Sequence, residues 1–429
     1  MCHILPKWRN KMENTASQSS VITAKLPDSL ARKLLLKALE NLPYGCLTLV
    51  EGDKSYRFGE HHSDLHATLV VKHPSFYRQA MFSGSIGAGE SYIQGHWTSP
   101  DLTKVVQLFA RNLPLLDKIE VKFGWLTGSV NRMKHLLNRN SQQGSKRNIL
   151  AHYDLGNALY EQFLDREMLY SSALYSDSEA SLEQAQLHKL KTICERLDLQ
   201  PGQTLLEIGT GWGALAIYAA KHYGVHVTTT TISDAQYAYA KARVEREGLS
   251  DCITLLTEDY RNLGGTYDRL VSIEMIEAVG HEYLLGFFKK LESLLKPHGR
   301  MLLQAITIAD QRYDSYRKGV DFIQRYIFPG GCLPSVQQMV GHLAKRTDMQ
   351  VWSIDDMGLD YAKTLRDWHN NFDRAIEQVQ ALGYGDDFIR MWKFYLSYCE
   401  GGFLERTTST VHLVAVRPDY RLPNAVSGN

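Results

Sequence analysis

The chain has 429 residues, of which 44% are apolar and 22% charged, a composition typical of a folded globular protein rather than a disordered one. Its 48 basic and 47 acidic side chains leave a formal net charge of +1, so no overall positive field indicates nucleic-acid binding. No apolar run reaches the roughly eighteen residues of a membrane span, and the first residues lack the apolar core of a secretory signal. We therefore expect a cytoplasmic protein without a nucleic-acid partner.

The cysteines and histidines do not form a metal-binding pattern. The six cysteines are scattered without a C-x-x-C pair, which argues against a zinc site and a disulfide framework. His61, His62 and His66 have no carboxylate or cysteine at a metal-ligand spacing and are interpreted as exposed loop histidines. No metal is predicted.

The first part of the chain predicts a small α+β domain over residues 26–140, after a flexible N-terminus over residues 1–25. Leucine and alanine recur at helical spacing over residues 30–42, with Arg32, Lys33 and Lys37 among them, which predicts a basic amphipathic helix. This helix either packs into its own domain or contacts an anionic surface. Residues 44–97 show short strand-like runs (CLTLVEG, SYRFG, ATLVVKH) and glycine-rich turns, and residues 102–116 show a helical pattern.

A linker is predicted next. Residues 121–153 contain several lysines and arginines but no acidic side chain, and the run NRNSQQGSKRN has the composition of a flexible connector. We expect the domain boundary near residue 140, with residues 141–429 forming the second domain.

The second domain alternates strands and helices from residue 199 onward. The strand-like runs are TLLEIG, VHVTTTT, CITLLTE, YDRLVSIE and RMLLQAI, with helical patterns between them. This alternation predicts an α/β fold with a mostly parallel, doubly wound sheet that carries helices on both faces. Helical patterns over residues 362–382 and 387–403 and a last strand, TVHLVAV, follow.

The first strand of this domain runs into a glycine-rich turn. Gly209, Gly211 and Gly213 lie between an apolar strand and a helix, where the backbone turns sharply and approaches a ligand closely. Glu207 precedes them, and its carboxylate would repel a pyrophosphate but attract a cation. The turn therefore favours S-adenosylmethionine, which carries a sulfonium and an amino group, over a dinucleotide.

Polar residues after the next two strands complete the predicted pocket. The second strand offers Thr231, Ser233 and Gln236 in place of the acidic residue that often holds a ribose, and Asp259 follows the third strand. Helix capping is an equally good interpretation of Thr231 or Ser233 alone.

Several segments together resemble the cyclopropane-fatty-acyl-phospholipid synthase family. Over about residues 145–420 they are, in order, NILAHYDLGNALYEQFLDREMLYSSALY, LLEIGTGWGALA, TISDAQ, EDYRNL, SIEMIEAVGHEY and FIQRYIFPGGCLPS. The resemblance implies a Rossmann-like class I methyltransferase domain that follows a smaller, N-terminal lipid-contacting domain. It also implies methyl transfer from S-adenosylmethionine to the cis double bond of an acyl chain in a membrane phospholipid, which yields a cyclopropane ring. By the same resemblance the cofactor is lined by Tyr170, Ser171, Glu207, Gly209, Gly211, Gly213, Thr231, Ser233, Gln236, Asp259 and Tyr260.

The reaction requires a dry site and a base. An alkene is a weak nucleophile, so methylation creates a carbocation that water must not reach, and one proton must then leave. The resemblance implies bicarbonate as this base, held in family members by a cysteine, a glutamate, a histidine and a tyrosine. The glutamate matches Glu277 and the tyrosine Tyr361, while Ser172 in YSSA and Gln304 in LLQAIT stand where cysteine and histidine are usual. Cys399 matches another cysteine discussed as an active-site residue.

Each of these residues also has a structural interpretation. Glu277 follows a strand at the sheet's carboxyl end, which favours function, but Tyr361 fits a core aromatic and Cys399 a buried, inert thiol. We expect a peripheral enzyme at the inner face of the cell membrane that contacts anionic lipid. A methylene- or methyl-branched product and a non-catalytic lipid- or cofactor-binding protein remain alternatives, and both a monomer and a homodimer stay open.

Overall fold

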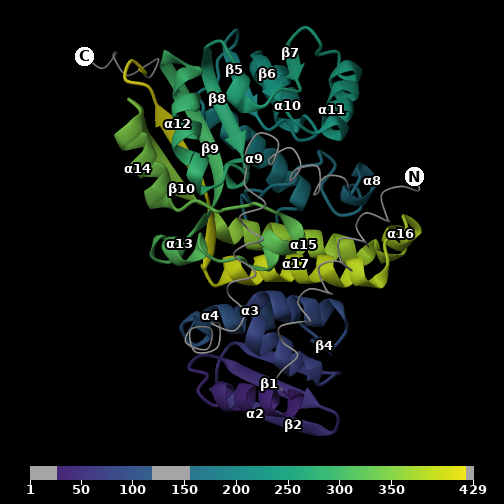
Figure 1. Cartoon of the computed structure of the whole chain (residues 1–429). Helices are drawn as coiled ribbons and strands as arrows, with labels where there is room; N and C mark the ends of the chain where they lie inside the picture. Colours follow the sequence, from purple (N-terminus) through teal and green to yellow (C-terminus); the bar gives the residue numbers. More distant parts are fainter. Residues whose placement is uncertain (1–26, 118–154, 422–429) are drawn as a thin grey trace. The chain divides into compact units, whose positions relative to one another are not determined.

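The structure is a computed structural model that describes residues 27–117 and 155–421 (Figure 1). The predicted flexible N-terminus, the acid-free stretch 121–153 and the predicted boundary near residue 140 lie wholly or almost wholly outside the described residues. Within them the chain forms two compact units. One contains the described residues up to 117 together with residues 318–329 and 365–407, and the other contains residues 155–317, 330–364 and 408–421.

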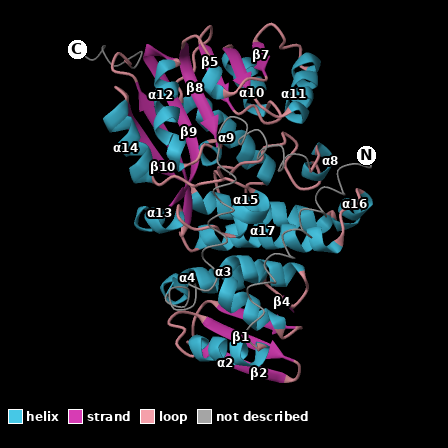
Figure 2. Ribbon diagram, viewed as in Figure 1, coloured by secondary structure: helices cyan, strands magenta, loops and turns pink. Residues whose placement is uncertain are grey.

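The larger unit is built on a seven-stranded sheet with the order β10-β11-β9-β8-β5-β6-β7 (Figure 2). Its strands are β5 (Thr204–Ile208), β6 (His226–Thr230), β7 (Ile253–Leu256), β8 (Tyr267–Ile273), β9 (Leu295–Ile308), β10 (Gln350–Asp356) and β11 (Thr408–Val416). Strands β5 to β9 pair in parallel, whereas β11 runs antiparallel to both β9 and β10. The predicted α/β fold with a mostly parallel sheet is thereby confirmed, and β10 is a strand that the sequence did not reveal.

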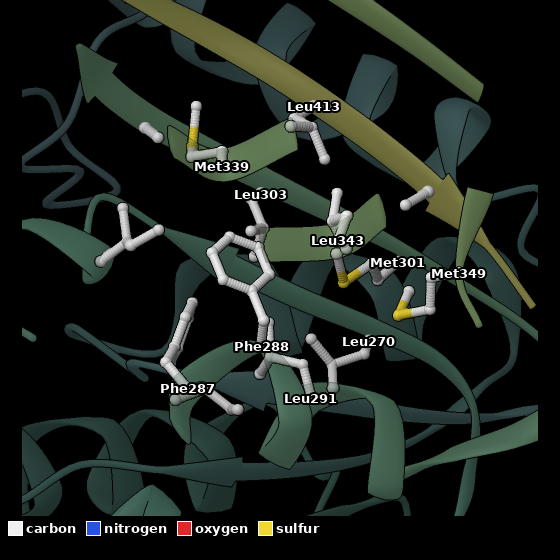
Figure 3. Packing of buried hydrophobic residues seen from close by; sticks show 14 of the residues in the cluster. Leu270, Phe287, Phe288, Leu291, Met301, Leu303, Met339, Leu343, Met349 and Leu413 are labelled. Carbon is white, nitrogen blue, oxygen red and sulfur yellow. The ribbon is translucent and has the colours of Figure 1, made fainter. Parts of the chain in front are cut away.

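Helices cover both faces of this sheet. They are α8 (Asn157–Tyr160), α9 (Leu182–Arg196), α10 (Ala214–Tyr223), α11 (Asp234–Arg246), α12 (Leu284–Ser293), α13 (Asp310–Tyr316) and α14 (Val336–Arg346), and α15 (Gly358–Arg374) begins here. Figure 3 shows one core, in which Phe287, Phe288 and Leu291 of α12 pack with Leu343 of α14 and with side chains of β8, β9 and β11. A second core joins α9, α10 and α11 to the opposite face. Because both faces are covered, β5, β8, β9 and β11 each contain a buried, mostly apolar run.

The smaller unit has a four-stranded sheet with the order β2-β1-β3-β4. Its elements are α2 (Asp28–Leu39), β1 (Cys46–Glu51), β2 (Lys54–Gly59), β3 (His66–Val71), α3 (Ser75–Ile93), β4 (Trp97–Thr98), α4 (Leu102–Arg111), α16 (Ile376–Ala381) and α17 (Asp386–Leu404). The α+β character is as predicted, but α3 occupies residues that were expected to form turns. No helix in the described part of the chain has both the length and the apolar character that crossing a membrane requires.

The smaller unit is not contiguous in sequence, which differs from the predicted division into residues 26–140 and 141–429. Helix α17 packs against α3 and α4. Gly401 of α17 lets Val106 of α4 approach closely. Glu400 of α17 accepts hydrogen bonds from Thr103 at 2.9 Å and from Arg366 at 2.6 Å. These contacts between residues far apart in sequence are not visible in local patterns.

Candidate active site

The glycine turn between β5 and α10 has the backbone that a ligand loop needs. Gly209, Gly211 and Gly213 have φ values of +105°, +53° and +89°, in the region that favours glycine. A Cβ on Gly211 would meet no other atom within 4 Å, so the turn is open at this point, whereas a Cβ on Gly213 would lie 3.2 Å from Ala240 of α11. Gly211 therefore leaves room for a ligand, and Gly213 allows α10 and α11 to pack.

Glu207 lies in the sheet directly before this turn. Its carboxyl accepts a hydrogen bond of 2.6 Å from the Thr229 hydroxyl, which is 2.7 Å from the Thr210 hydroxyl. Burial raises the pKa of Glu207 to about 8, and the Thr229 bond acts in the opposite direction. A cation bound at the turn would favour the charged form. Glu207 and the open turn therefore fit the sulfonium and ammonium groups of S-adenosylmethionine.

Thr231, Ser233 and Gln236 are buried and bonded to one another at the start of α11. The Ser233 hydroxyl caps the helix by accepting the Gln236 N–H at 3.4 Å, and the Thr231 hydroxyl donates to the Gln236 side chain at 2.9 Å. The structure thus shows the capping role that the sequence had left open for Ser233. Their contact with a cofactor stays a prediction.

Asp259 and Tyr260 also have partners within the protein. The Asp259 carboxylate accepts two hydrogen bonds from the Arg261 guanidinium, at 2.8 and 2.7 Å, and one from the backbone N–H of Arg261 at 3.0 Å. Burial acts to raise the pKa of Asp259, but these contacts outweigh it and lower that pKa. The Tyr260 ring packs edge-on against Phe287, with 5.5 Å between centroids. Their cofactor roles stay predictions.

The segment with Tyr170 and Ser171 connects to the glycine turn through aromatic rings. The Tyr170 ring centroid lies 5.2 Å from that of Tyr160, which in turn lies 5.2 Å from that of Trp212 in the turn. The Ser171 hydroxyl accepts a hydrogen bond of 2.7 Å from Lys189 of α9, and burial lowers the pKa of this lysine to about 8. The structure therefore brings Tyr170 close to the predicted cofactor turn.

Glu274 is the residue on which the predicted base-holding groups converge. Its Oε1 accepts hydrogen bonds from the Ser172 backbone N–H at 2.9 Å and from Gln304 Nε2 at 2.7 Å, and its Oε2 accepts one of 2.8 Å from the Tyr361 hydroxyl. Burial raises the pKa of Glu274, while these donors and the Lys189 charge act to lower it. The three donors come from separate parts of the chain.

Gln304 is held in one orientation by the neighbouring strand. Its Oε1 lies 2.8 Å from Nε2 of His412, its partner in the β9–β11 register, and Arg196 donates to His412 Nδ1 at 2.7 Å. Because the guanidinium only donates, the His412 proton is on Nε2. Burial lowers the pKa of His412 to about 3, so this ring is neutral. The Gln304 amide nitrogen is thereby directed at Glu274.

Ser172 contributes its backbone rather than its side chain. The residue is fully buried, and its hydroxyl donates to the Ala173 carbonyl at 2.9 Å. The next N–H, that of Ala173, donates to the Thr364 hydroxyl of α15 at 3.0 Å, which anchors the segment. The exchange of cysteine for serine at this position therefore leaves the N–H contact with Glu274 available.

Glu277 has different hydrogen-bond partners. Its Oε1 accepts the Ile306 N–H at 2.5 Å, while its Oε2 is buried without a hydrogen-bond partner. Burial, with a contribution from Glu274, raises the pKa of Glu277 to about 8. At neutral pH this carboxyl is therefore mostly protonated, and Glu277 does not share the donors of Glu274.

Cys399 belongs to the other compact unit, on α17. Burial, with a contribution from Asp321, raises the pKa of its thiol, so the thiolate is disfavoured. Its catalytic role stays a prediction. Among the described residues, no three histidine, cysteine or acidic side chains form a group that could hold a metal ion.

The sequence interpretation missed Glu274, although one signal for it was present. Glu274 and Glu277 both follow strand β8, at the sheet edge where parallel α/β folds bind ligands. Only Glu277 was singled out, because the family motif drew attention to it. Two carboxyl groups after one strand are candidates for separate roles when their surroundings differ.

Comparison with known proteins identifies the family. The family model of mycolic acid cyclopropane synthetase matches residues 140–413. The chain is 39% identical over 346 residues to the cyclopropane-fatty-acyl-phospholipid synthase of Escherichia coli K12, which covers 79% of this chain and 85% of that protein. It is 35% identical over 382 residues to tuberculostearic acid methyltransferase of Mycobacterium tuberculosis, which covers 87% of this chain and 88% of that protein.

Solved structures agree with this assignment. The structure of mycolic acid cyclopropane synthase CmaA1 with SAH and CTAB superimposes with a TM-score of 0.60 at 29% identity and covers 63% of this chain and 98% of that one. SAH is what S-adenosylmethionine becomes after methyl transfer, which agrees with the predicted cofactor. The chain therefore belongs to the mycolic acid cyclopropane synthetase family and is a methyltransferase that uses S-adenosylmethionine.

Proposed function

We propose that this enzyme methylates the cis double bond of unsaturated acyl chains in membrane phospholipids and closes a cyclopropane ring. One observation carries the proposal: the Glu274–Glu277 segment adjoins the glycine turn. A Cβ on Gly209 would lie 3.8 Å from the Met275 side chain, so a methyl donor bound at the turn is next to two carboxyl groups. The similarity to the Escherichia coli synthase over most of both chains supports the same reaction class.

Different residues of the larger unit bind the methyl donor and remove the proton. When bound, S-adenosylmethionine supplies an electrophilic methyl group. We assign its binding to the glycine turn and Glu207, and we assign its lining to Tyr170, Ser171, Thr231, Ser233, Gln236, Asp259 and Tyr260. Removal of the proton from the methylated acyl chain falls to the cluster after β8, where burial excludes water from the cation.

Bicarbonate, the predicted base, does not suit the described contacts. Its expected holders are Glu277, Tyr361, Ser172 and Gln304, but the last three direct their donors at the Glu274 carboxylate. The remaining residue, Glu277, has one buried carboxyl oxygen without a hydrogen-bond partner. The reaction proposed here therefore uses no bound bicarbonate.

A branched product is the second candidate. The similarity to tuberculostearic acid methyltransferase extends over 87% of this chain and favours it. In that case a 1,2-hydride shift moves the cation onto the methylated carbon, and loss of a proton from the new methyl group leaves a methylene branch, which a separate reduction by a hydride donor would convert to a methyl branch. Ring closure and methylene formation add the same CH2, so mass alone does not separate them.

We further propose that the protein works as a peripheral protein at the inner face of the cell membrane, because phospholipid acyl chains stay in the bilayer. Helix α2 supports an electrostatic contact with anionic lipid. Lys33 and Lys37 are exposed on it, as is Leu30, whereas Ala31 and Leu39 are buried in their own unit. The helix thus combines a packed face with an exposed basic one.

The test is product analysis of the purified enzyme with S-adenosylmethionine and vesicles of cis-unsaturated phospholipid. We expect a gain of one CH2 per reacted double bond by mass spectrometry. Proton NMR then separates a cyclopropane, whose ring protons resonate upfield of ordinary alkyl protons, from a methylene branch, whose protons are olefinic. Absence of any product and of any S-adenosylmethionine consumption would support the non-catalytic alternative instead.

A further inference from the structure

We propose that the Glu274 carboxylate is the base that takes the proton from the methylated acyl chain, in place of an external anion. This inference rests on the proposed function and deepens it by naming the proton acceptor. The donors around Glu274 are those that the family resemblance assigns to a bound anion. In the structure they hold a carboxylate of the protein itself.

The donor set is suited to an anionic base. Three hydrogen bonds of 2.7 to 2.9 Å reach the two Glu274 oxygens, from Ser172, Gln304 and Tyr361. All three groups donate in this geometry, so they favour the ionised carboxylate. Each oxygen keeps lone-pair capacity for a proton, because an ionised carboxylate accepts about four hydrogen bonds. Glu274 is thus oriented and retains capacity to accept a proton.

The backbone at Glu274 is held in an unfavourable conformation. Its φ of +50° is one that L side chains rarely adopt, and its N–H donates to the Gln304 carbonyl at 2.8 Å. Strain of this kind persists where the surrounding structure imposes it, often at functional sites. Here it turns the side chain into the donors directly after β8. Glycine would adopt this conformation without strain, so the glutamate occupies this position against a local conformational preference.

The two carboxyl groups of this segment have different surroundings. Glu277 has backbone donors only and one buried oxygen without a hydrogen-bond partner, and burial raises its pKa to about 8, which favours its protonated form at pH 7. Burial raises the pKa of Glu274, but its three donors and the Lys189 charge nearby act to lower it and stabilise the ionised form. Of the two carboxyl groups, Glu274 is therefore the one whose contacts support a negative charge, and neighbouring carboxyl groups with different surroundings can take separate roles.

Glu274 acts in the second half of the reaction, after methyl transfer. The alkene π electrons form a bond to the transferred methyl carbon, the C–S electron pair stays on sulfur, and a cation is left on the acyl chain. Glu274 takes one proton from that methyl group, and the C–H electron pair forms the last bond of the ring. The protonated Glu274 then releases its proton to water.

Two variants test this role. Glu274→Gln keeps the size of the side chain but removes the base, and Glu274→Gly leaves space for a small anion while suiting the positive φ. We expect both to keep S-adenosylmethionine affinity and to lose turnover by about 10²- to 10⁴-fold. Added formate or bicarbonate should restore part of the turnover in Glu274→Gly but not in Glu274→Gln. Wild-type turnover should persist in bicarbonate-free buffer, and the exposed Glu245→Gln serves as control.

These experiments distinguish a failure of the Glu274 role from a failure of the proposed function. If the wild type forms no product, the proposed function fails and the role of Glu274 fails with it. If the wild type is active and Glu274→Gln is equally active, only the role of Glu274 is refuted. Dependence of the wild type on bicarbonate would assign the proton to that ion instead. A fall in cofactor affinity that matches the fall in turnover would make Glu274 a structural residue.

Discussion

At the residue scale, the candidate site places buried carboxyl groups in different states by giving them different partners. Glu207 accepts from one hydroxyl, Glu277 from backbone N–H groups only, and Glu274 from three donors. The pKa values of Glu207 and Glu277 are each raised to about 8, first of all by burial. Both groups are therefore mostly neutral at pH 7 in the absence of a ligand, which links their charge to what binds beside them.

The raised pKa of Glu277 predicts a pH-dependent stability. A carboxyl whose folded pKa of about 8 exceeds its ordinary value of 4.5 contributes fully below pH 4.5, and the contribution is lost as pH rises through 8. Glu277→Gln stays neutral and keeps an acceptor for the Ile306 N–H. We expect the melting temperature of the ligand-free wild type to fall more steeply between pH 5 and about 8.5 than that of the variant. Each unit of pKa difference corresponds to about 1.4 kcal/mol.

Thermal denaturation over this pH range measures the effect. Glu207 shifts in the same direction, so Glu277→Gln should reduce the slope without abolishing it. The exposed Glu245→Gln should follow the wild-type curve. Parallel curves for wild type and Glu277→Gln would mean that Glu277 is ionised in the folded protein, contrary to its interpretation as the neutral partner of Glu274.

At the element scale, glycines serve two different purposes in this fold. In α3 they permit close packing: a Cβ on Gly89 would lie 2.5 Å from the Phe322 ring, and Gly84, with φ +51°, marks a kink. Glycine-rich sequence therefore suggested turns where a helix exists, because glycine usually disfavours a helix interior. In the turn after β5 the glycines instead provide positive φ and open space at Gly211.

The glycine turn predicts a selective loss of cofactor binding. Gly211→Val places a branched side chain in the open space of the turn, so we expect S-adenosylmethionine affinity, measured by calorimetry, to fall at least tenfold, about 1.4 kcal/mol or more. Gly248→Val is the matched control, because Gly248 also has positive φ, +69°, and no atom within 4 Å of its Cβ position. Both variants carry similar backbone strain. Equal affinity in the two variants would remove the turn from the cofactor site.

At the scale of the whole molecule, the chain is divided into units that do not follow its order. The smaller unit takes α17 from near the C-terminus, and its charged groups are used partly for internal contacts. Arg32 of α2, for example, donates to Glu51 at 2.9 Å and to the Tyr56 hydroxyl at 3.0 Å. The basic side chains of α2 that remain for an external partner are therefore Lys33 and Lys37.

Membrane binding is predicted to depend on these two lysines. A Lys33→Glu, Lys37→Glu double variant should bind anionic phosphatidylglycerol vesicles less tightly, since each basic side chain near such a surface contributes about 1 kcal/mol. The control is Lys191→Glu with Lys241→Glu, which changes the net charge equally on α9 and α11. Added salt should weaken wild-type binding. Sedimentation that is equal for both double variants would refute the role of α2.

Local patterns in the sequence determined the α/β alternation, the glycine turn with Glu207, and the basic helix now seen as α2. They were predictable because strand periodicity, helix periodicity and glycine conformation are properties of neighbouring residues. The family motifs also indicated Ser172, Gln304 and Tyr361, which the structure brings together at Glu274, and Glu277, whose part in the site stays a prediction. For the first three features the amino-acid order alone was sufficient.

Only the tertiary structure decided what those residues contact. Ser172, Gln304 and Tyr361 are separated by 132 and 57 positions, and their convergence on Glu274 depends on strand pairing and on the packing of α15. The neutral state of His412 likewise follows from its burial beside Arg196. Hydrogen-bond partners and pKa values arise from groups that are close in space but distant in sequence, and no local pattern encodes them.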